Sequence, residues 1–372
     1  MAEAGRTQTY RQVAIGSALG DDFLLFRRAT IIEHLGRMFH MEVDVFTDKG
    51  EVDFKKIVGT GVTIRLAHEG GTRFFHGFVT RIIHTGGSER VAHYRLTLSP
   101  WLWFLTRVSD CRFFQKMKVP DIIKQVLSKR GFDDIDTDRL KGHYPVREYC
   151  VQYRETDFNF VSRLMEEEGI YYFFTHEDNK HTMVLADSSS SHEAYEGCEI
   201  IPFFPPTEAD RGQEYVWDWQ KEQEVQPGKY SLRDYNFETP GEDLSANATF
   251  PRDYAVPNFE MFDCHPARYK TSADGDALSK VRLEEHQAYY EVIRATGDVR
   301  CTSCGCTFTL DGLNEEQDKE HLITSVVHQI ESDEYSSSAD GDSAAPVYES
   351  TFTAILATQQ YRPKRVTPKP MI

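Results

Sequence analysis

The feature that most restricts the fold of this chain is a repeat inside it. The segment FVTRIIH, residues 78–84, returns as LITSVVH, residues 322–328. The same shift in numbering aligns GVTIRL, which begins at Gly61, with GCTFTL, which begins at Gly305. Because two strands keep one register in both copies, we interpret them as a duplicated unit and not as a chance similarity.

The flanking segments extend the repeat. EVDVFTDKG, from Glu42, resembles EVIRATGDV, from Glu291, if five residues are dropped from the second copy. A strand of the type YRLTL follows the first copy, and STFTA follows the second. Short β-branched strands separated by glycine and charge indicate antiparallel sheet. We predict two copies of one small antiparallel β-barrel, the second interrupted by an insertion.

The length of 372 residues exceeds what one hydrophobic core usually serves, so several domains are expected. A helix with proline in its first turn, VPDIIKQVLSKRGF, begins a region of mixed type after the first set of strands. The predicted fold is mainly β with an α+β insert. Its predicted domains are a first tube-type barrel at 1–110, a helix-hairpin domain at 111–212, a second barrel at 213–240 and 288–360, an insertion at 241–287, and a connector at 361–372.

The stretch YCVQYRETDFNFVSRLMEEEGIYYFF, residues 149–174, predicts a helix, a stop and a hairpin. Thr156 and Asp157 suit the helix start, and Gly169 suits a left-handed end. Three glutamates, residues 166–168, fall in the last helical turn, where the helix dipole disfavours negative charge by roughly 0.3 to 1 kcal/mol each. Such a placement requires an explanation.

Two explanations are available for the glutamates. Two of the carboxylates could act as acid and base on a sugar or ester, with the aromatic residues stacking a sugar ring. Alternatively, they form a solvated helix end or pair with basic groups of a neighbouring chain. Catalytic pairs usually face one another across a cleft, which adjacent helical side chains do not do, so we favour the structural explanation. The sequence also lacks G-x-S-x-G, H-E-x-x-H and the glycine-rich phosphate-binding motifs.

Three of the seven cysteines, Cys301, Cys304 and Cys306, have a spacing that could supply half of a zinc site. The repeat places them opposite Ile57, Thr60 and Val62, which are ordinary barrel positions. We therefore expect small buried thiols, all seven reduced, with no metal and no cofactor. Trp217 and Trp219 are expected on one face of a strand, in a core or an interface.

The net charge of −17 disfavours nucleic acid and anionic lipid as partners. No apolar run approaches the roughly 18 to 20 residues that cross a bilayer, and the N-terminal residues do not form a secretory signal. We expect synthesis in the cytoplasm, with any export depending on the folded protein. The basic, proline-rich RPKRVTPKP near the end is interpreted as an extended connector, with a targeting signal as the weaker alternative.

These residues resemble a known family. The run PWLWFL…CRFFQKMKVPDIIKQVLSKRGF, then residues 149–174, then KHTMVLAD and YSLRDYNFETP are similar to the hub part of the VgrG spike proteins of type VI secretion, relatives of the contractile-phage baseplate hub. The resemblance runs from about Phe23 to Pro370. The residues taken as its structural motif are Tyr153, Glu155, Asp157, Phe158, Phe160, Leu164, Glu166, Glu167, Gly169 and Tyr171.

The resemblance implies a non-enzymatic, phage tail hub-like protein. It implies a homotrimer whose six barrels form a ring, which adapts a hexameric tube to a trimeric spike, with baseplate components as further partners. In such proteins a segment like RPKRVTPKP leads into an oligonucleotide/oligosaccharide-type barrel and a needle-like β-helix, through which tip and effector proteins attach. A hub from a phage-derived particle and a cell-wall glycan hydrolase acting through residues 166–168 remain the alternatives.

Overall fold

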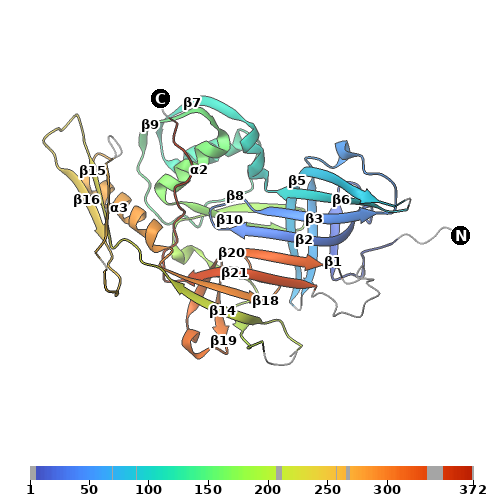
Figure 1. Cartoon of the computed structure of the whole chain (residues 1–372). Helices are drawn as coiled ribbons and strands as arrows, with labels where there is room; N and C mark the ends of the chain where they lie inside the picture. Colours follow the sequence, from blue (N-terminus) through green and yellow to red (C-terminus); the bar gives the residue numbers. More distant parts are fainter. Residues whose placement is uncertain are drawn as a thin grey trace.

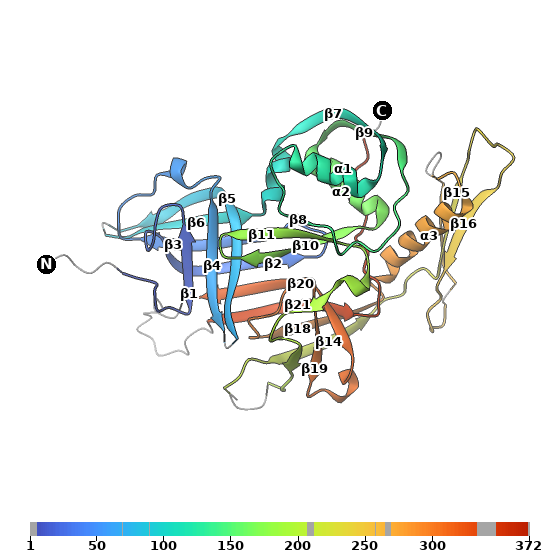
Figure 2. The same cartoon turned by 180° about the vertical axis from the view of Figure 1, so that it is seen from behind.

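The computed structural model describes residues 6–68, 70–88, 90–206, 212–256, 258–264, 269–332 and 347–370. Strand is the commonest regular structure in the described chain, whose centre is one thirteen-stranded sheet (Figures 1 and 2). Along the main path the strand order is β1-β4-β5-β6-β3-β2-β20-β21-β18-β14. No helix of the described residues is long and apolar enough to cross a membrane. The prediction of a mainly β chain is confirmed.

The first copy of the repeat supplies six strands of the sheet. They are β1 (Val13–Ser17), β2 (Leu25–His34), β3 (His40–Thr47), β4 (Gly61–His68), β5 (Gly71–Gly87) and β6 (Ala92–Ser99). Buried and exposed positions alternate along β2, β3 and β6, because successive side chains of a strand point to opposite faces. One face therefore packs on the core, and the other lies open.

The second copy supplies five equivalent strands: β14 (Val216–Gln223), β18 (Glu291–Gly297), β19 (Cys306–Asp311), β20 (Glu320–Glu331) and β21 (Tyr348–Leu356). An insertion separates β14 from β18, where the first copy has only the short turn between β2 and β3. It consists of β15 (Lys229–Asp234), β16 (Leu244–Thr249), β17 (Glu260–Cys264) and α3 (Ser272–Gln287). The insertion extends away from the central sheet (Figure 1).

The region between the two copies forms the helix-hairpin part. Its elements are β7 (Ser109–Met117), α1 (Val119–Ser128), β8 (Ile135–Asp136), β9 (Arg147–Thr156), α2 (Asp157–Glu168), β10 (Tyr171–Glu177), β11 (Lys180–Ala186), β12 (Glu193–Ala194) and β13 (Ile200–Pro202). The predicted order of helix, glycine stop and hairpin is confirmed by α2, β10 and β11. Both helices pack on the same core as the first copy.

Matching irregularities in the strands confirm the repeat. The β5–β6 ladder has a bulge at Thr80, and the β20–β21 ladder has one at Thr324. Each threonine hydroxyl donates a hydrogen bond of 3.2 Å to a carbonyl on the facing strand, that of Thr97 or Thr353. A bulge is a specific local device, so its recurrence at matched residues shows one folding pattern used twice.

A second pair of bulges extends the equivalence to strands that the sequence did not match. The register of β2 on β3 shifts at Arg27, and that of β14 on β18 shifts at Trp217. Both bulges stand at the same place relative to the repeated strands. The strand β14 is therefore the counterpart of β2.

Two details of the sequence alignment are wrong. Met41 of β3 pairs with Leu98 of β6, and Ile293 of β18 pairs with Ala354 of β21, which is the counterpart of Leu98. Met41 therefore corresponds to Ile293, whereas the sequence alignment of Glu42 with Glu291 is wrong by three residues. The strand β19 is also shifted by two residues on β20, because Gly305 takes the place that Gly59 has in the first copy. Neither copy closes into a separate barrel through hydrogen-bonded ladders among the described residues, since both belong to one sheet.

The two copies join edge to edge where β2 pairs antiparallel with β20. Glu33 and His328, both buried, face each other across this joint with Oε2 and Nε2 2.8 Å apart. The guanidinium of Arg73 lies 3.5 Å from the same carboxylate. Burial alone would raise the pKa of Glu33, but the polar contacts of His176 and His328 and the charge of Arg73 lower it overall.

The prediction of seven reduced thiols is wrong for two of them. Cys198 and Cys301 form a disulfide, which ties the end of the helix-hairpin part to the second copy. Cys304 is buried and donates its thiol hydrogen to the carbonyl of Thr324. Among the described residues, no group of three or more His, Cys, Asp or Glu is placed to hold a metal ion.

Candidate functional site

The motif residues gather around helix α2, and those at its start build a buried polar network. The hydroxyl of Thr156 accepts a hydrogen bond of 3.1 Å from the backbone N–H of Asn159, as the sequence predicted for a helix cap. The buried carboxylate of Asp157 accepts hydrogen bonds from Arg112, Arg130 and Gln152 at 2.5 to 2.8 Å. This charge is paired in full, as a buried carboxylate requires.

The middle of α2 is packing surface. The carboxylate of Glu155 accepts three hydrogen bonds from Arg163, and the Arg163 guanidinium lies over the ring of Phe160. Phe160 stacks on Phe114, and Leu164 is fully buried. Two further motif aromatics, Tyr153 and Phe158, are half-buried.

The end of α2 overturns the expectation of a solvated or intermolecular glutamate cluster. Glu167 and Glu168 both bind Arg147 of β9, at 3.0 and 2.5 Å. Burial would lower the pKa of Arg147, but these two carboxylates outweigh it and raise that pKa. Glu166 is only 4% exposed and binds Arg37 at 3.2 Å. Both arginines belong to the same chain as the glutamates.

A fully buried arginine of α3 completes the helix end. Arg282 donates hydrogen bonds to the carbonyl oxygens of Glu166 and Glu167, at 2.7 and 3.0 Å, and to the carboxylate of Glu285 at 2.6 Å. The last carbonyls of a helix carry partial negative charge and lack partners within the helix. Arginine on a neighbouring helix therefore explains how three glutamates are tolerated here.

The segment 361–370, which we name the connector, lies across this helix end. The carboxylate of Glu166 accepts hydrogen bonds from the backbone N–H of Val366 at 3.1 Å and of Thr367 at 2.9 Å. The hydroxyl of Thr367 donates a further bond of 3.0 Å to Glu166. Arg37 binds the connector too, through the carbonyl of Lys364.

Three other connector residues hold its first part. Arg362 donates hydrogen bonds to the carbonyls of Gly169 and Asp187 and binds the carboxylate of Glu284 at 2.8 Å. Arg365 binds Glu285. The hydroxyl of Tyr361 donates to the carbonyl of Leu35. The connector is thus extended, as predicted, but it is held at many points along its length.

Gly169 and Tyr171 shape the floor under the connector. Gly169 has φ of 72°, and a Cβ there would lie 2.6 Å from Val281 and 3.0 Å from Arg362. Tyr171 is buried, its ring meets Tyr361 edge-on, and its hydroxyl lies 2.8 Å from Nε2 of His192. We name the residues that hold the connector, together with Arg282, which binds Glu285 and the carbonyl of Glu166, the connector clamp. It comprises Arg37, Glu166, Gly169, Tyr171, Arg282, Glu284 and Glu285.

Sequence reasoning missed four of the seven clamp residues: Arg37, Arg282, Glu284 and Glu285. In α3, Leu283 and Glu285 are buried and Glu284 binds the connector, although residues 283–286 match none of the motifs considered above. Arg37 lies in a turn of the first copy and gives no local signal. The one usable hint was the excess of negative charge on the helix end beside a basic segment 361–370.

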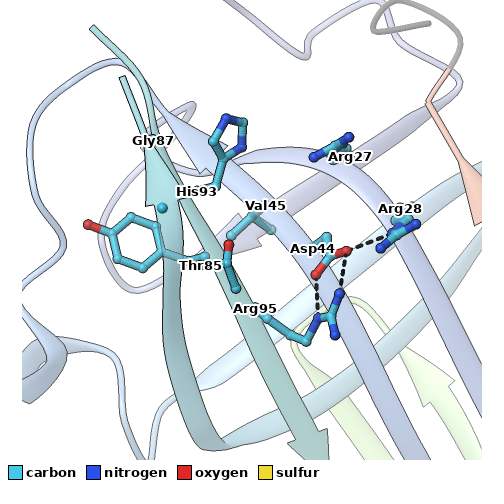
Figure 3. Close-up of a pocket in the computed structure, with 10 residues that line it drawn as sticks. Arg27, Arg28, Asp44, Val45, Thr85, Gly87, His93 and Arg95 are labelled. Carbon is cyan, nitrogen blue, oxygen red and sulfur yellow. Dashed lines mark hydrogen bonds and ion pairs between the residues drawn. The ribbon is translucent and has the colours of Figure 1, made fainter. Parts of the chain in front are cut away.

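A separate recess lies on the open face of the first copy, with a volume of about 280 Å³ (Figure 3). Asp44 binds both Arg28 and Arg95 at 2.6 Å across three neighbouring strands. Both arginines are substantially exposed, so these ion pairs contribute little to stability. The recess is a charged part of the sheet surface, and it contains no nucleophile with a paired base.

The fold agrees with the comparisons to known proteins. The family model described as "Phage tail baseplate hub (GPD)" matches residues 32–334. The chain belongs to this baseplate hub family. A type VI secretion system spike protein of Pseudomonas aeruginosa, VgrG1b, is 39% identical over 367 residues, which are 98% of this chain and 49% of that protein. The chain therefore spans about half the length of this relative.

Two further proteins are similar to this chain. The Escherichia coli protein c3393, described as a type VI secretion component similar to bacteriophage T4 tail proteins gp27 and gp5, superposes with a TM-score of 0.69. It is 20% identical, and the match covers 96% of this chain and 80% of that one. The actin cross-linking toxin VgrG1 of Vibrio cholerae is 30% identical over 299 residues, 80% of this chain and 27% of the toxin.

Proposed function

We propose that this chain is the structural hub of a type VI secretion spike, in which three copies close a ring. The observation that carries the proposal is the joint between β2 and β20. It places two equivalent strand sets edge to edge within one chain, without any partner. Three chains joined in the same manner present six similar strand sets, two from each chain.

Such a ring can bind partners of two different symmetries. Its six similar strand sets can seat a hexameric tube ring, while its three chain ends can carry a trimeric spike. A repeated domain makes this possible without six identical chains, because each chain supplies two nearly equivalent contacts. We infer that the tube ring, baseplate proteins and, through the part that follows the hub in longer relatives, tip and effector proteins are its partners.

The connector clamp fits this role. Its residues come from the first copy, from α2 and from α3, so the connector is bonded to three parts of the chain at once. A pull on the connector would be shared among these parts. We infer that the motif residues, from Tyr153 to Tyr171, serve this anchorage and the core around it.

We infer that the hub is not an enzyme. The carboxylates of Glu166, Glu167 and Glu168 are each bound to arginine, and Glu166 also accepts three hydrogen bonds from the connector. No pair of them faces a cleft. The similarity to the actin cross-linking toxin covers 27% of that protein, and its chemistry is not transferred to this chain.

The proposal includes a location. We infer assembly in the bacterial cytoplasm, followed by ejection with the secretion machine. The alternative, a hub of a phage-derived particle, has the same fold and is favoured by the description of the family model. Deletion of the gene from its own bacterium separates the two, since only a type VI hub is needed for secretion of the tube protein.

The direct test of function uses the purified chain and the hexameric tube protein of the same bacterium. Electron microscopy of the mixture should show tube rings capped by one hub ring each, with three hub chains per hexamer. The comparison variant is Arg81→Glu, which changes a charge in the second half of β5 and leaves the clamp intact. It should form fewer capped rings, because it weakens the contact between hub chains. Absence of any hub–tube complex at high concentration would refute the proposed adaptor role.

A further inference from the structure

The central sheet has two edges that the described residues leave without a partner strand. The strand β4 pairs only with residues 71–78 of β5, so the second half of β5, residues 81–87, is open on that side. At the other end of the sheet, β14 pairs with β18 and otherwise only through a bridge at Val216. In Figure 1 the strands β5 and β14 stand at opposite ends of the stack. Open edges of this length require a partner.

The internal repeat tells which strand each edge corresponds to. Cross-strand pairing matches Ala29 with Trp219, and it matches Ile82 with Val326. The open edge of β14 thus corresponds to the edge of β2, which is covered by β20. The open half of β5 corresponds to the half of β20 that binds β2. The joint inside the chain is a template for a joint between chains.

We propose that β14 of one chain pairs antiparallel with residues 81–87 of β5 in a neighbouring copy, in the register of the β2–β20 joint. Inside the chain, Ile31 lies opposite His328, and Ile32 lies opposite Val327. The same register between chains places Lys221 opposite His84 and Glu222 opposite Ile83. This inference rests on the ring proposed above and specifies its contact.

Side-chain size supports the register. The joint inside the chain sets the small Ala29 opposite the large Ile330. Between chains the corresponding positions are Trp219 and Gly87, because Gly87 and Ile330 both occupy the last step of their ladders. In the joint inside the chain the small residue lies on β2, and in the proposed joint the small residue lies on β5. Each joint still pairs one large residue with one small residue. Exchanging the partners would set Trp219 against Ile330, or leave Ala29 facing a glycine, so the two joints are not interchangeable.

Charge supports the same partner. Residues 216–224 carry three acids, Asp218, Glu222 and Glu224, against one lysine, Lys221, while the open half of β5 carries Arg81 and His84 and no acid. The register sets Glu224 opposite Arg81 of the neighbouring copy, and opposite charges directly across a sheet stabilise the pair. The whole chain has a net charge of −17, so a local attraction is needed to bring copies together.

The residue after this pair gives a further sign of a covered surface. Val225 is the counterpart of Leu35, whose N–H donates to the carbonyl of Thr324 and whose side chain is 2% exposed. Val225 itself is 56% exposed in the single chain. The proposed joint places its N–H against the carbonyl of Thr80 in the neighbouring copy and removes its side chain from water.

Cysteine cross-linking tests the register. In a background with the exposed Cys111 and Cys264 changed to serine, we combine Glu222→Cys with Ile83→Cys in the full chain. The two positions lie about 30 Å apart within one chain, across eight strands, so a disulfide between them must join two copies. Ile32→Cys with Val327→Cys is the matched positive control, because it forms the same pair inside the chain. Gln220→Cys with Ile83→Cys is the negative control, because this pair is two residues out of the proposed register.

The expected result is a disulfide-linked trimer for Glu222→Cys with Ile83→Cys and about tenfold less product for the out-of-register pair. Light scattering on the unoxidised protein tests trimer formation separately from the register of the joint. A trimer whose chains cross-link only out of register, or not at all, overturns this joint and leaves the ring standing. A single chain at every concentration, with only the internal control forming, overturns the ring and the joint together.

Discussion

The carboxylate of Glu166 binds the backbone N–H of Thr367 at 2.9 Å, although two hundred residues separate them in the chain. The same carboxylate binds Arg37, so one buried group joins the first copy, helix α2 and the connector. A carboxylate that accepts several hydrogen bonds from backbone and arginine forms strong, charge-assisted contacts. We therefore regard Glu166 as the central residue of the connector clamp.

Glu166→Gln should loosen the connector. The amide keeps one acceptor but loses the charge, so the free energy of unfolding should fall by roughly 1 to 3 kcal/mol. Trypsin should also cleave faster after Arg365, because the segment opens locally more often. Denaturant unfolding and timed proteolysis measure the two effects.

The matched control for Glu166 is Glu196→Gln, which changes an exposed glutamate. It should alter the unfolding free energy by less than about 0.5 kcal/mol. Equal effects of the two changes would mean that the connector is not held by Glu166.

Gly169→Ala should destabilise more than a glycine change in open space. Both Gly169 and Gly197 have positive φ, 72° and 79°, so alanine is strained by about 1 kcal/mol or more at either position. Only at Gly169 does the added Cβ meet other atoms, those of Val281 and Arg362. The loss at Gly169 should exceed that at Gly197 by roughly 1 to 3 kcal/mol, measured by chemical unfolding. Equal losses would show that α3 and the connector yield easily.

The two bulge threonines test the structural repeat. Thr80→Val and Thr324→Val each remove one hydroxyl that donates to a carbonyl 3.2 Å away. Each change should cost roughly 1 to 2 kcal/mol of unfolding free energy, because each removes the bond to the carbonyl and a second contact to a hydroxyl, that of Ser99 at 3.4 Å or of Thr353 at 2.8 Å. A large cost at one threonine and none at the other would indicate that the two bulges have different roles.

Acid should destabilise the joint between β2 and β20. Burial, with the charge of Arg73, lowers the pKa of His328 to about 4, below its ordinary value near 6.5. The unfolded chain then binds more protons between these values, so stability falls as the pH falls from about 6.5 to about 4. The share of His328 is roughly 3 kcal/mol.

Unfolding free energies measured from pH 7 to pH 4 give this slope. His328→Gln should flatten it, whereas His143→Gln, an exposed change, should leave it unaltered. A slope that His328→Gln does not change would assign the acid sensitivity to other groups, such as His76 or His192, whose pKa values burial also lowers to about 4.

The repeat could be predicted from the sequence where the two copies have similar side chains at matched positions of a strand. Residues 78–84 and 322–328 share threonine and histidine at matched places, and their bulge and ladder proved equivalent. The match of β2 with β14 could not be found, because Arg27 and Trp217 share only a backbone irregularity. Side-chain similarity disappears where only backbone geometry is repeated.

The clamp was predictable only in part. Thr156, Gly169 and Leu164 follow local rules of helix capping and periodicity, and these rules identified them. The partners of Glu166 and of Glu167 come from remote segments, Arg37 and Arg147, and no spacing in the sequence connects them. The expectation of a solvated helix end failed because it considered the helix alone.

The central claim is that three chains form a ring of six equivalent strand sets, and the mass of the particle in solution tests it most directly. Light scattering on the purified chain across a hundredfold range of concentration, about 1 to 100 μM, should approach three times the mass of one chain at the upper end. The variant Arg81→Glu should shift the transition to higher concentration, because it sets two like charges against each other at the open edge. A mass of one chain throughout, or a limiting mass of two or four chains, would contradict the account.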